Sequence, residues 1–115
     1  MATEVRARTM YSSISAQKLR LVCDTVRGMH VDKALAVLEF TPKKGAGIIS
    51  KTLNSAIANA VNNNDLDRDS LVIKAIWADG GPMLKRYKAG ARGRYKPRVR
   101  RTAHLTIVLA DSAAQ

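Results

Sequence analysis

The sequence predicts an α+β fold with a protruding basic arm, and three observations support this prediction. Between residues 13 and 62, apolar residues recur at helical spacing in three separate segments. From Leu71 onward the apolar period changes from 3.6 to 2, which is the period of a strand. Between Gly80 and Ala110 the chain has no acidic residue, although it has nine lysines and arginines there. We therefore expect a helical half followed by a sheet, with the basic arm joining two of its strands.

The first element is predicted to be a strand at Thr3–Ser12, because apolar and polar residues alternate there. An extended arm is the alternative, since Arg6 and Arg8 lie on the polar side of this segment. The side chains expected on the other face are those of Val5, Ala7, Thr9 and Tyr11.

The next segment predicts a helix that starts at a cap formed by Ser13 or Ser15 and ends at about Arg27. A serine hydroxyl accepts a hydrogen bond from the free N–H groups of a first helical turn. Gly28 follows, and glycine adopts the left-handed conformation that commonly ends a helix. The apolar stripe of this helix is expected to face the core and consists of Leu19, Val22, Cys23 and Val26.

Two further helices are predicted. Asp32 is expected to cap a short helix at Lys33–Phe40. Thr41 and Pro42 then indicate a restart, because a hydroxyl cap is often followed by proline at the first helical position. This third helix is predicted to run from Pro42 to about Asn62. The residues expected to be buried are Ala34, Leu35 and Leu38 in the short helix, and Ala46, Ile49, Leu53, Ala56, Ile57 and Ala60 in the long one.

The opposite face of the third helix combines small residues with lysines and amides. Such a face allows close approach to a nucleic-acid backbone, while its cations and donors reach phosphates and sugars. An ordinary solvated face is the alternative interpretation. The residues on this face are Lys44, Gly47, Lys51, Asn54, Ser55, Ala58 and Asn62.

Two antiparallel strands are predicted after the acidic loop that ends at Asp69. Leu71, Ile73 and Ala75 alternate with Val72, Lys74 and Ile76 before Trp77, and Leu105, Ile107 and Leu109 alternate with His104, Thr106 and Val108. Gly80-Gly81-Pro82 is expected to interrupt the first of these strands with a bend or bulge. The chain is then expected to reverse direction within Lys88–Gly93.

The return strand of the basic arm has five cations at every second position, namely Arg92, Arg94, Lys96, Arg98 and Arg100. In an extended strand, alternate side chains point to one face, so these cations would follow one another at about 6.7 Å. An isolated two-stranded hairpin is barely stable in water. The arm is therefore expected to be ordered by an anionic partner, with a solvated loop as the alternative. Guanidinium groups favour phosphates, and Tyr87 and Tyr95 can stack on bases.

Composition excludes several other classes of function. The formal net charge is +11, and nine of these charges belong to the arm, which leaves +2 for the remainder. Cys23 is the single cysteine, and the two histidines, His30 and His104, have no paired carboxylate or serine at a suggestive spacing. No catalytic residue, metal site or cofactor is therefore expected. The chain shows neither an apolar membrane span nor a signal-peptide stretch, so we expect a cytoplasmic protein without a membrane partner.

Six stretches of the sequence form a pattern by their order and spacing, namely Ser15–Val22, Val26–Gly28, Ser55–Ala60, Gly81–Arg86, Gly93-Arg94 and Arg100–Val108. With these stretches the chain resembles the bacterial large-subunit ribosomal protein L-twenty-two family over nearly its whole length. This resemblance implies three helices packed on a small three-stranded antiparallel sheet, with a long protruding basic β-hairpin.

The resemblance also implies a function. Residues 1–115 would form one RNA-binding domain, with a globular part at about 1–80 and 102–115 and the hairpin at about 81–101. The implied partners are the large-subunit (23S-type) ribosomal RNA, neighbouring large-subunit proteins and the nascent peptide in the exit tunnel. The protein would support assembly and line the tunnel with its hairpin. A free DNA-binding, nucleoid-type protein with a basic β-arm is the alternative.

The residues expected to bind RNA combine the basic arm with cations and donors of the helical half. The tunnel-facing tip departs from the family pattern, because Ala89-Gly90-Ala91 replaces the usual Pro-Arg-Ala and Gly80 replaces the usual acid before Gly-Pro. The expected RNA contacts are Arg6, Arg8, Lys18, Arg20, Arg27, Lys43, Lys44, Lys51, Asn54, Asn62, Lys85, Arg86, Lys88, Arg92, Arg94, Lys96, Arg98, Arg100, Arg101, Thr102 and His104. The expected tip residues are Lys88, Ala89, Gly90, Ala91, Arg92, Gly93 and Arg94.

Overall fold

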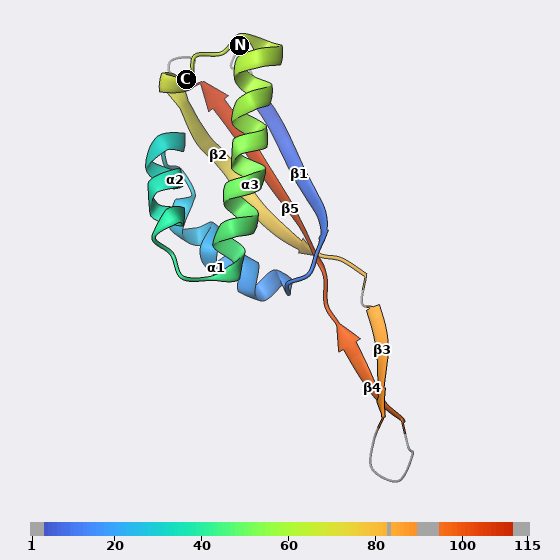
Figure 1. Cartoon of the computed structure of the whole chain (residues 1–115). Coiled ribbons are helices and arrows are strands. Elements are labelled where there is room, and N and C mark those ends of the chain that lie inside the picture. The colour runs from blue at the N-terminus through green and yellow to red at the C-terminus, as the bar shows by residue number, and fades with distance from the viewer. Residues whose placement is uncertain (1–3, 83, 90–94, 112–115) are drawn as a thin grey trace.

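The computed structural model describes residues 4–82, 84–89 and 95–111 and confirms the predicted α+β fold (Figure 1). Three helices are combined with a three-stranded antiparallel sheet, and a second pair of strands lies beyond it. In chain order the elements are β1 (Glu4–Ser12), α1 (Ala16–Val26), α2 (Val31–Glu39), α3 (Lys44–Ala58), β2 (Leu71–Gly80), β3 (Leu84–Ala89), β4 (Tyr95–Arg100) and β5 (Ala103–Asp111).

The main sheet has the strand order β1-β5-β2, so the last strand of the chain lies in the middle. β5 pairs with β1 and with β2, and the register aligns Ala7 and Ile76 with Ile107. α3 packs across β1 and β5, and α1 packs against β2 (Figure 1). The buried apolar side chains of the helices and of one sheet face form a single core.

The first helix agrees with its prediction. Ser15 caps α1, since its hydroxyl accepts a hydrogen bond from the Lys18 N–H at 3.3 Å. Gly28 has a φ of +81°, as expected for a left-handed residue after a helix. The predicted apolar stripe is buried throughout, with Leu19, Val22, Cys23 and Val26 at most 1% exposed.

The second helix begins earlier than predicted. His30, and not Asp32, caps α2, because its ring Nδ1 accepts a hydrogen bond from the Asp32 N–H. The Asp32 carboxylate instead forms an ion pair with Arg68, at 2.9 Å between oxygen and guanidinium nitrogen. Ala34 and Leu38 are buried as predicted, whereas Leu35 is only partly buried against the core.

The third helix begins later than predicted, at Lys44 instead of Pro42, and has no side-chain cap. The Thr41 hydroxyl donates a hydrogen bond back to the Val37 carbonyl at 2.7 Å, which ties it to the preceding helix. The chain continues beyond α3 as a wider π-helical turn at Asn59–Asn63. The predicted buried stripe is confirmed at all six positions, Ala46, Ile49, Leu53, Ala56, Ile57 and Ala60.

The predicted alternation fails at two bulges. In β1 the register shifts between Thr9 and Ser12, so Ser12 is buried while Tyr11 is 61% exposed. In β2 it shifts between Ile73 and Ala75, so that burial resumes at Ile76 and Ala78. An extra residue in one strand reverses which side chains face the core, and a period of 2 cannot reveal it.

β5 is also more buried than strict alternation predicts. Leu105, Ile107 and Leu109 face the core as expected, yet Thr106 and Val108 on the other face are only 2% and 3% exposed. Because β5 is the central strand, its outer side chains are flanked on both sides by those of neighbouring strands.

Two short segments, Gly81-Pro82 and Arg101-Thr102, connect the main sheet to β3 and β4, and we call them the neck. Pairing of β2 with β5 ends at Gly80, after which the Gly81 N–H donates to the Thr102 carbonyl at 2.9 Å. The Thr102 hydroxyl donates to the Pro82 carbonyl at 2.6 Å. Beyond this neck, β3 and β4 pair antiparallel from Leu84↔Arg100 to Ala89↔Tyr95, away from the main sheet (Figure 1). The predicted reversal at Lys88–Gly93 extends outside the described residues.

Candidate nucleic-acid interface

A groove lies at the end of the molecule from which β2 and β5 leave the main sheet. It consists of three adjoining hollows of about 690, 310 and 260 Å³ that share several lining residues. We call it the cationic groove, and its lining comes from the segment after β1, the first turns of α1 and α3, and the neck. The lining residues are Ser13, Ile14, Ser15, Ala16, Gln17, Lys18, Arg20, Leu21, Lys43, Lys44, Gly45, Gly80, Gly81, Arg101 and Thr102.

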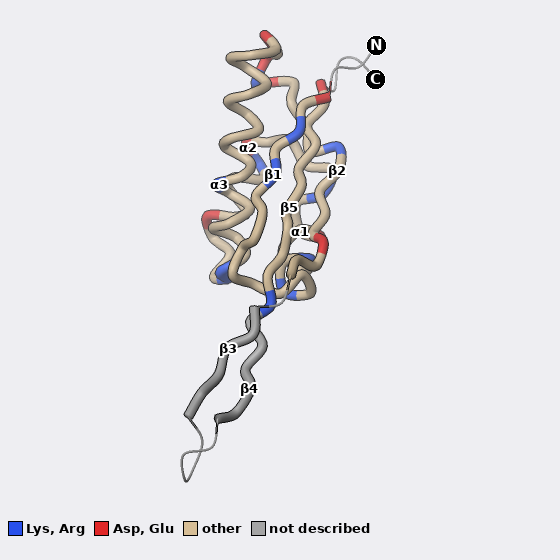
Figure 2. Tube along the Cα trace, turned by 90° about the vertical axis from the view of Figure 1, so that its right-hand side faces the viewer, with Lys and Arg blue, Asp and Glu red and all other residues tan. Residues whose placement is uncertain are grey.

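The charge of the cationic groove has one sign. None of the described residues that line it is acidic, and Figure 2 shows lysines and arginines gathered at this end of the main body. The N-termini of α1 and α3 also lie here, and the positive end of a helix dipole favours anions. The five cations among its described lining residues are Lys18, Arg20, Lys43, Lys44 and Arg101.

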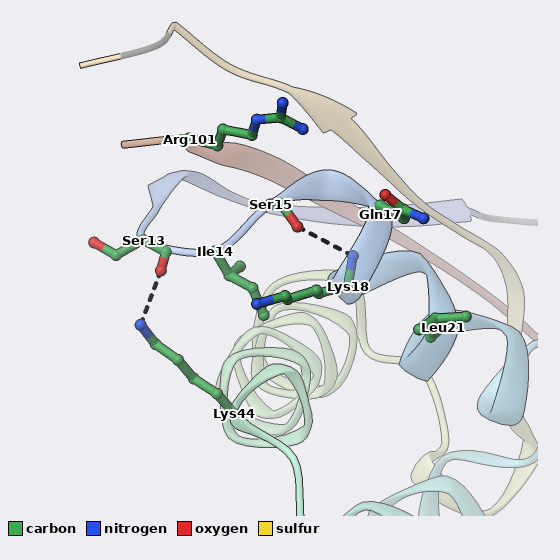
Figure 3. A pocket seen from close by; sticks show the side chains of 8 residues that line it. All are labelled: Ser13, Ile14, Ser15, Gln17, Lys18, Leu21, Lys44 and Arg101. Carbon is green, nitrogen blue, oxygen red and sulfur yellow. Dashed lines mark hydrogen bonds between the residues drawn. The ribbon is translucent and has the colours of Figure 1, made fainter. Parts of the chain in front are cut away.

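Side chains from separate elements face one another across the largest hollow (Figure 3). Lys44 spans from α3 to the segment after β1, where its ammonium donates to the Ser13 carbonyl at 2.8 Å. Lys18 and Arg101 are exposed and form no ion pair with any described residue. These two cations are therefore available to an external anion.

Two arginines among the predicted RNA contacts make hydrogen bonds within the protein. The Arg20 Nε donates to the Ala78 carbonyl at 2.9 Å, and the Arg27 guanidinium donates to the Ile76 carbonyl at 2.9 Å and to Asp24 at 2.6 Å. The bonds to the Ala78 and Ile76 carbonyls tie α1 to β2. Arg20 lines the cationic groove, whereas Arg27 does not.

Arg6 and Arg8 lie elsewhere, on the sheet face opposite the core. Both are exposed, and the register places them beside Val108 and Thr106 of β5. Lys74 lies on β2, on the far side of β5 from β1, and forms an ion pair with Glu4 of β1. The hydrogen bond from the Lys74 ammonium, together with its charge, lowers the pKa of the Glu4 carboxyl.

The polar face of α3 is not drawn together with the cationic groove. Lys51, Asn54 and Asn62 are exposed, and the last two line a separate shallow hollow of about 260 Å³ with Arg68. A helix rises about 1.5 Å per residue, so Asn62 lies on the order of 25 Å along the axis from Lys44. The helix therefore offers two separate contact regions.

The remaining predicted contacts belong to the neck and the hairpin. Thr102 is buried, and the His104 Nδ1 accepts a hydrogen bond from the Tyr11 N–H at 3.0 Å. Within β3 and β4 only the backbone is described; these strands contain Lys85, Arg86, Lys88, Ala89, Lys96, Arg98 and Arg100. The predicted tip residues Gly90, Ala91, Arg92, Gly93 and Arg94 lie outside the described residues.

Sequence reasoning missed the uncharged part of the cationic groove. Ser13, Gln17 and Leu21 line it, although they were not predicted as site residues. Ser13 and Ser15 were predicted only as alternative caps of the first helix. The sequence signal for the two α1 residues was indirect, because Gln17 immediately precedes Lys18 and Leu21 immediately follows Arg20. Both Gln17 and Leu21 are exposed.

The interior offers little chemistry. Burial raises the pKa of the Cys23 thiol to about 11, so that the thiol is neutral at physiological pH. Among the residues that the structure describes, no group of three or more His, Cys, Asp or Glu side chains is placed to hold a metal ion. None of the described helices is both long and apolar enough to cross a membrane.

Comparisons with known proteins agree with the motifs. The sequence profile of the family "Ribosomal protein L22p/L17e" matches residues 7–110. A large ribosomal subunit protein uL22 from Chloroflexus aggregans is 51% identical over 110 residues, which cover 96% of this chain and 97% of that protein. The protein of the same name from Desulfotalea psychrophila is 50% identical over 109 residues, covering 95% and 99%. The chain therefore belongs to the ribosomal protein L22p/L17e family.

Proposed function

We propose that this chain is a structural protein of the large ribosomal subunit that binds ribosomal RNA chiefly through the cationic groove and has no catalytic role. The observation that carries the proposal is the convergence of five cations and two helix N-termini in a groove whose described lining contains no acidic residue. Its relatives are named as large-subunit proteins, which supports the ribosome, and hence the cytoplasm, as its place of action.

The groove suits a folded RNA backbone. Lys18 and Arg101 approach it from different elements, so phosphates of two strands or of a bend can be neutralised together. The N-terminus of α3, which has no side-chain cap, adds backbone N–H donors. These donors favour a phosphate, because the positive end of the helix dipole lies there. Arg6 and Arg8 on the outer sheet face would reach a separate RNA segment.

The hairpin is proposed to extend this binding into the exit tunnel, where its tip meets the nascent peptide. The resemblance to the family supports this role, and so does the antiparallel pairing of β3 and β4 beyond the neck. Cations of the return strand would hold the hairpin on RNA. The tip would influence how the tunnel responds to the nascent peptide and to macrolides.

The groove is tested by a matched pair of substitutions, Lys18→Gln and Lys33→Gln. Both lysines are exposed on helices, but only Lys18 lines the cationic groove. Binding to protein-free large-subunit ribosomal RNA is measured across a salt series. Each phosphate contact contributes roughly 0.7 to 0.9 to the slope of log affinity against log salt. We expect Lys18→Gln to lower the slope by about one contact and Lys33→Gln to leave it unchanged. An unmodified protein with an absolute slope below about 3 would contradict binding through many phosphates.

Sedimentation separates the ribosomal function from the DNA-binding alternative. A tagged chain should migrate with the large subunit when lysates are fractionated at high and low magnesium concentration. Migration with the nucleoid would instead favour the alternative, which the comparisons do not support.

The tunnel role is tested in a complementation strain. Deleting Leu84-Lys85-Arg86 should leave large subunits assembled but change their response to macrolides, because it shortens the outgoing strand. Replacing Arg98, Arg100 and Arg101 by alanine should impair incorporation. The reverse pattern, scored by subunit profiles and drug sensitivity, would contradict these roles.

A further inference from the structure

Tyr11 occupies a position in β1 that is unfavourable for folding. It lies at the bulge, and its φ of +58° is in the left-handed region, which costs a non-glycine residue about 1–2 kcal/mol. Its side chain is also 61% exposed, so burial in the core does not offset this cost. A bulky residue held in such a conformation is a candidate for a functional role.

The structure holds the tyrosine ring in a defined place. The Tyr11 N–H donates to the His104 Nδ1 at 3.0 Å, and the two rings meet edge to face with centroids 4.8 Å apart and an interplanar angle of 89°. His104 is itself packed beside Gly81, where an added Cβ would lie 3.2 Å from the ring Cε1. A T-shaped contact covers at most one face of the tyrosine ring, so an aromatic face remains open to solvent.

The surroundings favour an anionic partner that carries flat groups. Tyr11 lies two residues before Ser13, and its neighbour Ser12 pairs with Ala103, which is two residues from Arg101. Ser13 and Arg101 both line the cationic groove. Chain order and strand pairing thus place Tyr11 next to residues of the groove, and we expect a base of an RNA whose backbone lies there to be within reach of the ring.

We propose that Tyr11 is a stacking site for an unpaired nucleobase of the RNA whose backbone occupies the cationic groove. This inference rests on the proposed RNA-binding function and names one further element of that site. Bases of a duplex are stacked on each other, so only a base in a loop, bulge or end can stack on the ring. The strained backbone fixes the ring outward, which lowers the entropy lost when the base binds.

The test compares Tyr11→Ala and Tyr11→Phe in binding to protein-free large-subunit ribosomal RNA. Loss of an aromatic–base stack should weaken binding roughly fivefold to a hundredfold in Tyr11→Ala. Tyr11→Phe keeps the ring and should bind within about twofold of the unmodified protein, a margin that the same stacking energetics allow. The salt slope should be unchanged in both variants, because no cation is removed. A perfect RNA duplex, which offers no unpaired base, should bind the alanine variant and the unmodified protein equally.

Two further variants separate stacking from folding. Tyr11→Gly relieves the strained φ and should unfold at a temperature no lower than the Tyr11→Ala protein, yet bind RNA as weakly. Tyr11→Trp introduces a second tryptophan in addition to Trp77. Stacking on a base should quench the fluorescence of the new tryptophan when ribosomal RNA is bound. Unaltered RNA affinity of Tyr11→Ala, or tryptophan emission that RNA leaves unchanged, would overturn the stacking site. Neither outcome affects the proposed function, which instead fails if the unmodified protein does not bind this RNA.

Discussion

Replacement of Gly81 by alanine should destabilise the protein far more than the same change one residue earlier. A Cβ added at Gly81 would lie 2.5 Å from the Thr102 hydroxyl oxygen, which is closer than real Cβ contacts allow. That hydroxyl cannot simply rotate away, because it donates to the Pro82 carbonyl at 2.6 Å and is buried. The Thr102 backbone also cannot move freely away from the added methyl group, because the Gly81 N–H donates a hydrogen bond to the Thr102 carbonyl.

The magnitude follows from two losses. Overpacking a tight site costs typically about 1–3 kcal/mol. Loss of the Thr102 hydroxyl hydrogen bond adds about 0.5–1.5 kcal/mol. We therefore expect Gly81→Ala to lower the free energy of unfolding by roughly 2–4 kcal/mol, a large part of the stability of a small domain. At Gly80 an added Cβ meets nothing within 4 Å, so Gly80→Ala is the matched control and should be nearly neutral.

Urea unfolding followed by circular dichroism measures both variants, and a double-mutant cycle identifies the contact. Thr102→Ala removes the hydroxyl oxygen that the new methyl group would meet. In that background Gly81→Ala should cost at least about 1 kcal/mol less than it does alone, because residues in contact are not additive. Equal effects of Gly81→Ala and Gly80→Ala, or strict additivity with Thr102→Ala, would refute the account of the neck.

Three further predictions concern the body of the protein. Gly47→Ala on the exposed face of α3 meets nothing within 4 Å and should raise the free energy of unfolding by about 0.5–1 kcal/mol, as urea midpoints would show; a loss would contradict the open face. Arg27→Ala removes the hydrogen bond to the Ile76 carbonyl and should lower the free energy of unfolding by about 1 kcal/mol, whereas Lys33→Ala should leave it unchanged. Burial raises the pKa of the Cys23 thiol in the folded protein to about 11. The contribution of this thiol to the free energy of unfolding should therefore be fully present below the unfolded pKa near 8.5 and decrease as the pH rises toward 11. At pH 8 iodoacetamide should modify Cys23 only in urea-unfolded protein, and rapid modification of folded protein would contradict its burial.

Much of the fold follows from apolar periodicity alone. The stripes of α1 and α3 were predicted at every position, because burying an amphipathic face is what stabilises a helix in a protein. Helix ends were less predictable, because they depend on single hydrogen bonds with competing partners. Thr41 resembles a cap in sequence, yet its hydroxyl bonds to Val37. His30 is an uncommon cap residue and carried no such signal.

The candidate site was predicted in kind but not in place. Charge counting identified the cations, since an unmixed basic segment is visible in any linear sequence. It could not indicate that Lys18, Lys44 and Arg101 share one groove, because they are separated by 26 and 57 residues in the chain. It also could not show that Arg20 and Arg27 reach carbonyls of β2, since an arginine that donates to a carbonyl and one that does not look the same in a sequence.

The cationic groove is assembled where periodic structure stops. β1 ends beside it, α1 and α3 begin beside it, and β2 and β5 leave the main sheet there. The topology therefore brings four separate segments of the chain, 13–21, 43–45, 80–81 and 101–102, to one end. The bulge that turns Tyr11 outward is part of the same construction, because without the register shift a strict alternation would bury the Tyr11 side chain and expose Ser12. Deleting Tyr11 should give a regular β1, because Thr9 opposite Leu105 and Ser12 opposite Ala103 would then be two residues apart in both strands. Ser13 and Ser15 should keep their places in the groove, while the exposed ring is lost. Folding would tolerate such a regular β1 better than RNA binding would, since the core residues Val5 and Ala7 precede the bulge and keep their partners on β5.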